Sequence, residues 1–171
     1  MNKTRASFVT VCSLAMLVVG CGKKEPAPAG AATSGAASST TAPATGRAIE
    51  ITGNDTMKFS VTEIRAKAGE TLSVTLVNVG TMPKLSMGHN WVLMKSQSVV
   101  DAFVAESPMA ATTDYVPQNR KGDIIAHTKM LGPKERDTVT FKAPSQPGKY
   151  PYLCSFPGHY QVGMKGELIV E

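Results

Sequence analysis

The chain has 171 residues, of which 42% are hydrophobic and 6% aromatic, and its formal net charge is +5. Lysines and arginines are interspersed with acidic residues and do not form clusters, so the sequence gives little support to nucleic-acid binding. Without Lys3 and Arg5, which belong to the N-terminal segment described next, 16 basic side chains face 13 acidic ones, a net charge of +3. That weak excess suits ordinary solubility, or mild attraction of an acidic partner.

The first 20 residues are typical of an export signal. Lys3 and Arg5 precede an apolar run over 8–19 that is too short for an ordinary membrane-spanning helix. The sequence 18–21, Val-Val-Gly-Cys, resembles the bacterial lipobox, in which the cysteine is acylated and becomes the new N-terminus. We therefore expect residues 1–20 to be a lipoprotein signal peptide and Cys21 to carry lipid. The alternative is ordinary cleavage nearby, which would leave Cys21 as a free thiol.

The segment that follows, 21–46, is expected to be a tether. After Cys21 it consists of Gly, Ala, Pro, Ser and Thr apart from Lys23, Lys24 and Glu25, and cannot bury enough apolar surface to offset the entropy of ordering. A flexible chain of this length reaches roughly 25–30 Å. Position 22 is glycine and offers no aspartate-type signal for retention in the inner membrane, so the outer membrane is the expected location.

Residues 47–171 are long enough for one domain with a single core, and strand signals dominate them. Residues 71–77 alternate polar and apolar side chains, as a half-buried strand does. Gly, Pro, Asn and Asp residues separate the short strands, which indicates a Greek-key sandwich or barrel. The expected strands are 48–51, 59–61, 71–77, 91–94, 137–141, 150–153 and 166–170. Residues 96–107 place Val99, Val100, Phe103 and Val104 at helical spacing, which predicts a short helix outside the sheets.

Cysteine usage narrows the chemistry of this domain. Cys12 would leave with the signal and Cys21 would be consumed by lipid, which leaves Cys154 as the only thiol of the folded domain. A disulfide is then impossible, and Cys154 is a metal ligand, a nucleophile or a buried apolar filler. It ends a strand, and the turn after it leads to His159 and Met164 within eleven residues.

This set of donors favours copper. Thiolate and thioether donors are soft, imidazole serves both oxidation states of copper, and two His with one Cys and a distant Met form the site of blue-copper proteins in general. The second imidazole is His89, which is expected to begin another strand at the same end of the sheet, and the carbonyl of Gly88 is positioned to approach the metal opposite Met164. Zinc remains chemically possible, although thioether is a poor zinc ligand. A Cys–His protease is disfavoured because His159 shares one tight loop with Cys154.

The chain resembles the azurin and auracyanin family of blue-copper proteins over nearly all of 48–171. The resemblance is carried by the stretches 52–57, 82–84, 87–93, 125–129, 137–141 and 154–159. It implies an all-β, eight-stranded Greek-key cupredoxin sandwich with one short external helix. It also implies that one type 1 copper is bound by His89, Cys154 and His159, with Met164 and the Gly88 carbonyl axial. An apolar docking patch around His159 would include Met87 and Phe156.

Three features depart from azurins. Four residues separate His159 from Met164, where azurins have three, and this spacing resembles that of auracyanins. The azurin disulfide is absent because no cysteine occurs between 22 and 153. Asn78 stands where many azurins carry a pH-sensitive histidine, so that pH response is not expected. His127 matches an azurin histidine but is expected on the surface, and Trp91 is expected in the core.

The sequence therefore predicts a non-enzymatic, monomeric carrier of single electrons, exported to the periplasmic side and held on a membrane by lipid. Expected partners are redox proteins such as c-type cytochromes, oxidases, reductases or photosynthetic complexes. Asn90, next to His89, is expected to hydrogen-bond around the Cys154 loop and tune the reduction potential, or else to be a simple turn residue. The alternative function is copper binding or trafficking without redox turnover. A copper enzyme is disfavoured because His127 alone cannot build a second site.

Overall fold

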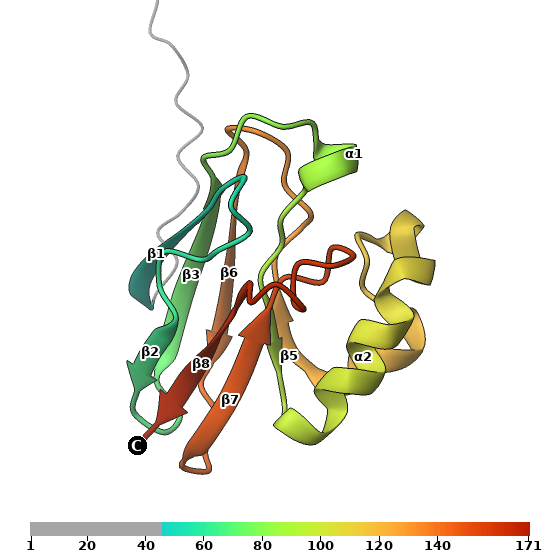
Figure 1. Ribbon diagram of the computed structural model, residues 1–171. Coiled ribbons are helices and arrows are strands. Elements are labelled where there is room, and N and C mark those ends of the chain that lie inside the picture. Colours follow the sequence, from blue (N-terminus) through green and yellow to red (C-terminus); the bar gives the residue numbers. More distant parts are fainter. Residues whose placement is uncertain (1–45) are drawn as a thin grey trace, which may run out of the picture. The chain divides into compact units, whose positions relative to one another are not determined.

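Eight strands form in the part of the chain that a computed structural model describes, residues 46–171 (Figure 1). The expected signal peptide, Cys21 and nearly all of the tether lie outside the described residues. The strands are β1 Arg47–Gly53, β2 Glu63–Ala66, β3 Thr71–Asn78, β4 Val92–Met94, β5 Ile124–His127, β6 Arg136–Lys142, β7 Gly148–Leu153 and β8 Lys165–Val170.

The strands are divided between two sheets that face each other. One sheet has the order β1-β3-β6 and the other the order β2-β8-β7-β4-β5. β1 runs parallel to β3 and β2 parallel to β8, whereas the remaining neighbours are antiparallel. Because consecutive strands change sheet repeatedly, the chain winds around one core. The predicted eight-stranded sandwich is confirmed.

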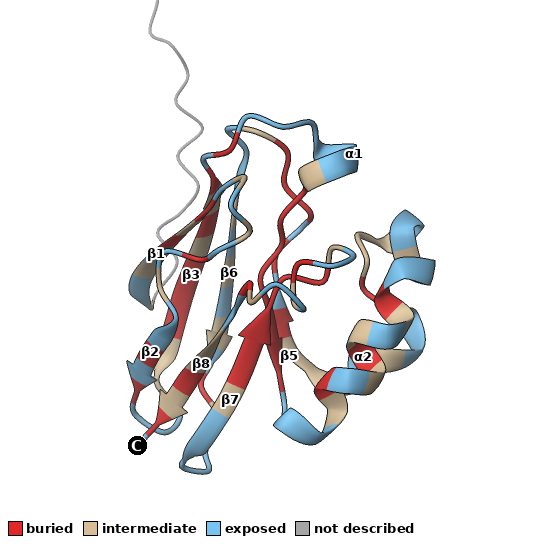
Figure 2. Cartoon of the chain, in the orientation of Figure 1, coloured by how far each residue is buried: buried red, intermediate tan, exposed pale blue. Residues whose placement is uncertain are grey.

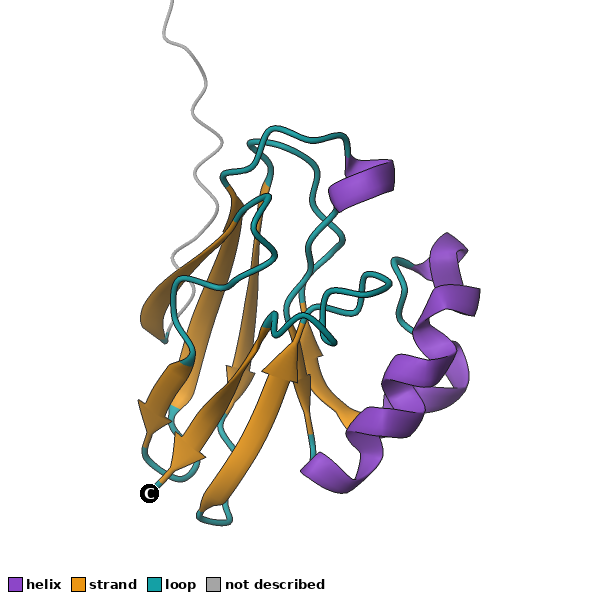
Figure 3. Ribbon diagram, viewed as in Figure 1, coloured by secondary structure: helices purple, strands orange, loops and turns teal. Residues whose placement is uncertain are grey.

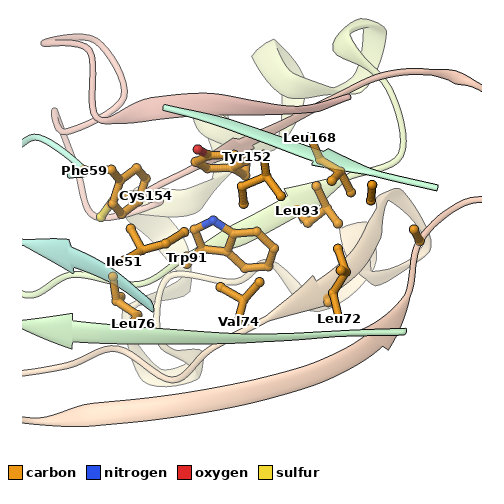
Figure 4. Close-up of a cluster of buried hydrophobic side chains, with 14 of the residues drawn as sticks. Ile51, Phe59, Leu72, Val74, Leu76, Trp91, Leu93, Tyr152, Cys154 and Leu168 are labelled. Atoms are coloured by element: carbon orange, nitrogen blue, oxygen red, sulfur yellow. The ribbon is translucent and has the colours of Figure 1, made fainter. Parts of the chain in front are cut away.

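Alternating side chains build the interior. In β3, Leu72, Val74 and Leu76 point inward and are fully buried, and each contributes about 1.5–3 kcal/mol relative to an exposed side chain. Figure 4 shows the indole of Trp91 between Tyr152 of one sheet and Val74 of the other. Figure 2 shows buried residues along much of β3 and at the end of β7, whereas the start of β7 and most of α1 are exposed.

Trp91 is fully buried, as predicted, and organises the aromatic part of the core. Its ring lies 5.4 Å from that of Tyr152 and 5.8 Å from that of Phe141, between ring centroids. The indole Nε1 has no hydrogen-bond partner. A buried N–H without a partner costs free energy, so the burial of this large apolar ring must outweigh that cost.

The helical segments within 97–123 lie outside the five-stranded sheet, beside β5 (Figure 3). The predicted helix appears as η1 Gln97–Val99 and α2 Val100–Glu106, and a 3₁₀ helix, η2 Ser107–Thr113, continues it. Val100 and Phe103 are buried against Val92, Met94 and Leu153, which explains the helical spacing of these apolar residues. Two further short helices were not predicted, α1 Lys84–Met87 and η3 Gln118–Asp123.

Two of the expected strand positions were wrong. Residues 59–61 form no strand: Phe59 makes one isolated bridge to Gly53, and the strand begins later, at Glu63. His89 does not begin β4 but forms an isolated bridge with Leu131 ahead of it. Both segments belong to loops at one end of the sandwich, where side chains are fixed by contacts that short-range alternation does not show. Within 46–171 no helix is both long and apolar enough to span a membrane.

Candidate metal centre

Strand pairing brings His89 and Cys154 together. β4 and β7 are antiparallel neighbours, and Val92 at the start of β4 pairs with Leu153 at the end of β7. Cys154 directly follows that pair and His89 lies three residues before it, so both reach the same end of the sheet. The β7–β8 connection then carries His159 to the same place.

The three candidate donor groups converge on one point. The ligand atoms of His89, Cys154 and His159 all lie within 4.8 Å of one another. Nδ1 of His89 is 3.3 Å from Nδ1 of His159, which is 3.5 Å from Sγ of Cys154. His89 and Cys154 are fully buried and His159 is 3% exposed. In 46–171 this is the one group of His, Cys, Asp and Glu residues with metal-binding geometry.

A backbone carbonyl fixes the orientation of His89. Its Nε2 lies 3.0 Å from the carbonyl oxygen of Asn54, which can only accept a hydrogen bond. Nε2 therefore carries the proton, and in the neutral ring Nδ1 presents a lone pair to His159 and Cys154. A cation placed between the two Nδ1 atoms and Sγ of Cys154 would use all three as ligands, so the arrangement fits a metal ion.

Burial controls the protonation of these groups. It lowers the pKa of His159 to about 4, with the neighbouring His89 adding to the effect, and it also lowers the pKa of His89. Burial raises the pKa of the Cys154 thiol to about 12, although the backbone amides of Asn90 and Phe156 act in the opposite direction. At neutral pH the imidazoles are therefore ready to bind a cation, whereas the thiol ionises only when a metal replaces its proton.

Backbone hydrogen bonds close the loop that contains His159. The amide of Cys154 donates to the carbonyl of Met164 at 3.1 Å, and the amide of Met164 donates to the carbonyl of His159 at 2.9 Å. Gly158 and Gly163 adopt φ values of +85° and +94°, which side chains disfavour. These two left-handed glycines turn the chain so that the longer loop returns to β8 with Met164 fully buried.

Gly88 is buried next to His89, where a side chain would not fit. A Cβ atom there would lie 2.7 Å from the carbonyl oxygen of Lys84 and 2.9 Å from Sδ of Met130. Within 46–171 no backbone amide donates a hydrogen bond to the Gly88 carbonyl. Glycine at this position therefore avoids displacing the Lys84 carbonyl or the Met130 side chain.

Asn90 connects the His89 segment to the Cys154 loop. Its Oδ1 accepts a hydrogen bond from the amide of Ser155 at 2.8 Å, and its Nδ2 donates to Oγ of Ser155 at 2.8 Å. Nδ2 also donates to the carbonyl of Asp114 at 3.1 Å. The side chain is fully buried and does more than form a local turn, because it joins three segments of the chain.

Aromatic side chains lead from the centre to the surface. Phe156 is half-buried, and its ring centroid lies 4.6 Å from that of His159 and 5.0 Å from that of Tyr115. Met87, the other expected member of the docking patch, is also half-buried. Its helix α1 lies at the same end of the sandwich as the β7–β8 loop (Figure 1).

Two residues set aside by the sequence analysis lie outside the centre. His127 is exposed at the end of β5. Asn78 is buried and satisfied: its Nδ2 donates to the Leu131 carbonyl at 3.1 Å, and its Oδ1 accepts from the Gly80 amide at 2.9 Å. The carbonyl of Asn54 and the hydroxyl of Ser155 were missed as contacts of the site. Asn54 belongs to one of the stretches that carried the resemblance, but a backbone carbonyl gives no sequence signal of its own.

The donor set fits copper better than it fits zinc. Two imidazoles and one cysteine lie in a site from which water is largely excluded, and Met164, buried in the same cluster as Cys154, adds a thioether. The single cysteine matters, since structural zinc sites commonly use more thiolates.

Comparisons with known proteins agree with this chemistry. The model of the family "Copper binding proteins, plastocyanin/azurin family" matches residues 46–171. Azurin from Pseudomonas denitrificans is 42% identical over 130 residues, which cover 72% of this chain and 97% of that protein. Outer membrane protein H.8 from Neisseria gonorrhoeae is 38% identical over 115 residues, which cover 66% of this chain and 61% of that protein.

Solved structures of auracyanins are similar as well. Auracyanin from Roseiflexus castenholzii superposes with a TM-score of 0.65 at 37% identity, over 72% of this chain and 96% of that one. Auracyanin A from Chloroflexus aurantiacus gives a TM-score of 0.63 at 32% identity, over 72% and 98%.

Proposed function

Because the chain belongs to the plastocyanin/azurin family of copper-binding proteins, we propose that it carries single electrons between redox partners. The copper supplies a one-electron couple between Cu(I) and Cu(II). The protein supplies a fixed donor set, and the observation that carries the proposal is the convergence of three buried donor atoms within 4.8 Å.

Each candidate ligand has a defined part in this proposal. His89 and His159 bind through Nδ1 and Cys154 through Sγ, which are the atoms that face one another. The thioether of Met164 and the carbonyl of Gly88 would complete the donor set when copper is bound. Hydrogen bonds hold His89 through Asn54 and the Cys154 loop through Asn90, so the donors change position little when the charge of the site changes.

Burial favours a carrier over the two alternatives. An enzyme needs an open ligand position for substrate, and in this proposal the thioether of Met164 and the carbonyl of Gly88 would leave none. A trafficking protein needs ligands that exchange metal readily, whereas His89 and Cys154 are fully buried. A carrier should therefore retain copper against a competing chelator, and a donor protein should release it quickly.

Electron exchange is proposed to take place at the His159 edge. Phe156 contacts the His159 ring and Met87 lies on α1, so both suit an apolar docking patch for c-type cytochromes, oxidases, reductases or photosynthetic complexes. Met87→Lys should slow electron exchange with a c-type cytochrome in stopped-flow measurements and leave the absorption spectrum unchanged. Met109→Lys, on the 90% exposed Met109 of η2, is the matched control. Equal rates for the two variants would contradict this patch.

The chain is proposed to be an exported bacterial protein held on a membrane by lipid at Cys21. The similarity to azurins and to an outer membrane protein supports export and makes the outer membrane the preferred location. Cys21→Ala should move the protein from the membrane fraction to the soluble periplasmic fraction and abolish labelling by fatty acid. Membrane retention of this variant would exclude the proposed anchor.

Redox titration tests the function itself. The copper-loaded chain should take up and release one electron per copper reversibly, with the same spectrum after repeated cycles. Loss of copper on each reduction would contradict the electron-carrier function and favour a role in copper trafficking.

A further inference from the structure

The segment from Gly53, the last residue of β1, to Lys58 contacts the residues of the metal centre at several points. Asn54 accepts the hydrogen bond from His89 described above. At the two ends of the segment, Gly53 lies against Met164 and Lys58 reaches the loop that precedes Met164. Neither Gly53 nor Lys58 offers a donor atom to the metal, so any effect on the centre must act through the ligands.

The backbone of Gly53 lies next to the methyl group of the Met164 side chain. A Cβ atom at Gly53 would lie 2.9 Å from Cε of Met164 and 3.3 Å from Cδ2 of His89. Gly53 itself is buried, and its carbonyl accepts a hydrogen bond from the Val79 amide at 2.9 Å, so its backbone is held in place. The absence of a side chain therefore sets how far Met164 and His89 extend toward the strand.

Lys58 fixes the other side of the same ligand. Its Nζ donates a hydrogen bond to the carbonyl oxygen of Val162, across a large separation in sequence. A Cβ atom at Gly163 would lie 2.8 Å from this Nζ, so the ammonium group lies directly on the turn that leads into Met164. The amides of Val162 and Gly163 donate to the carbonyls of Gly158 and Tyr160, so the Lys58 contact adds an external hydrogen bond to those within the loop.

We propose that Gly53 and Lys58 are positioning residues that together set the distance of the Met164 thioether from the copper. The inference rests on the proposed blue-copper function. The hydrogen bond from Lys58 fixes the position of the 159–164 loop, and the missing side chain of Gly53 leaves space for the Met164 methyl group. The axial distance tunes the thiolate-to-copper absorption and the reduction potential of such sites.

Lys58→Met tests the loop contact in the copper-loaded full chain. The variant keeps the length of the side chain but removes the donor and the charge. We expect a changed ratio of the thiolate-to-copper absorption bands, changed copper hyperfine splitting, and copper release to a chelator about two- to fivefold faster, as loss of one exposed charge-assisted hydrogen bond implies. Lys58→Arg, which retains a donor and the charge, should restore most of the wild-type spectrum.

A charge effect alone is separated by a control and by salt. Lys142→Met removes an exposed lysine from the end of β6 and should leave the spectrum unchanged. If Lys58→Met shifts only the reduction potential, and 1 M salt removes the shift, Lys58 acts as a distant charge and the inference is overturned. An unchanged spectrum in Lys58→Met overturns it as well.

Gly53→Ala tests the second contact. The added methyl must displace Met164 or His89, so we expect a larger spectral change than in Lys58→Met and copper release about tenfold faster, in line with the cost of overpacking a core. Gly122→Ala is the matched control, because a Cβ atom there meets no atom within 4 Å. Wild-type spectra for Gly53→Ala would overturn the inference. A wild-type chain without any thiolate-to-copper band would refute the proposed function itself, and the inference with it.

Discussion

Replacing Asn90 with alanine should destabilise the metal-free protein substantially. The change removes three hydrogen bonds, two with Ser155 at 2.8 Å and one with the Asp114 carbonyl at 3.1 Å. At about 1 kcal/mol each the free energy of unfolding should fall by about 3 kcal/mol, and more if the buried Ser155 amide finds no new partner. For a domain of this size about 4 °C corresponds to 1 kcal/mol, so the melting temperature should fall by roughly 12 °C.

Thermal unfolding of the metal-free chain, followed by circular dichroism, measures this loss without the stabilisation that copper adds. Asn119→Ala is a matched control, since the Asn119 hydrogen bond to Glu106 is exposed, and its effect should stay within about 0.5 kcal/mol. A decrease of less than about 1 kcal/mol for Asn90→Ala would refute the view that Asn90 joins the segments around the centre.

Three further predictions concern protons and the core. The pKa of the Cys154 thiol is raised to about 12 and that of His159 is lowered to about 4, so copper binding between pH 7 and 9 should release about one proton per ion. The copper affinity measured by calorimetry should therefore rise about tenfold per pH unit. The same slope in a Cys154→Ser variant would contradict this prediction. Tyr152→Phe removes the hydrogen bond of 2.7 Å to the Val61 carbonyl and should cost about 1–2 kcal/mol in denaturant unfolding; a neutral effect would be the opposite result. The fully buried Trp91, whose Nε1 has no partner, should emit at shorter wavelength than an exposed tryptophan and resist acrylamide quenching, and ready quenching would place it outside the core.

The sequence predicted the regular part of the fold well because its strands bury one face each. In β3 the buried Leu72, Val74 and Leu76 alternate with more polar side chains, and this period is visible without a structure. β2 was missed because Glu63–Ala66 is a short edge strand with only two buried residues. Residues 59–61 have the sequence pattern of a strand, but only Phe59 makes a bridge, to Gly53. The 3₁₀ helix Ser107–Thr113 has no apolar period to reveal it.

The same contrast holds for the metal centre. Cys154, His159 and Met164 could be grouped from their spacing because one loop carries them, whereas His89 joins them only through the pairing of β4 with β7. The contact of Asn90 with the Cys154 loop could be suggested from its place beside His89. The contacts made by the Asn54 carbonyl and by Lys58 depend on how a loop distant in sequence folds, and they cannot be predicted from residue type or spacing.

The most direct test of the central claim is the visible absorption and electron paramagnetic resonance spectrum of the Cu(II)-loaded chain, compared with the Cys154→Ser variant. The account predicts an intense red-region thiolate-to-copper band with narrow copper hyperfine splitting, both absent from the variant. A band shifted toward green would indicate that the longer His159–Met164 loop brings the thioether closer. A folded, copper-loaded wild-type chain without a thiolate band would contradict the electron-carrier function.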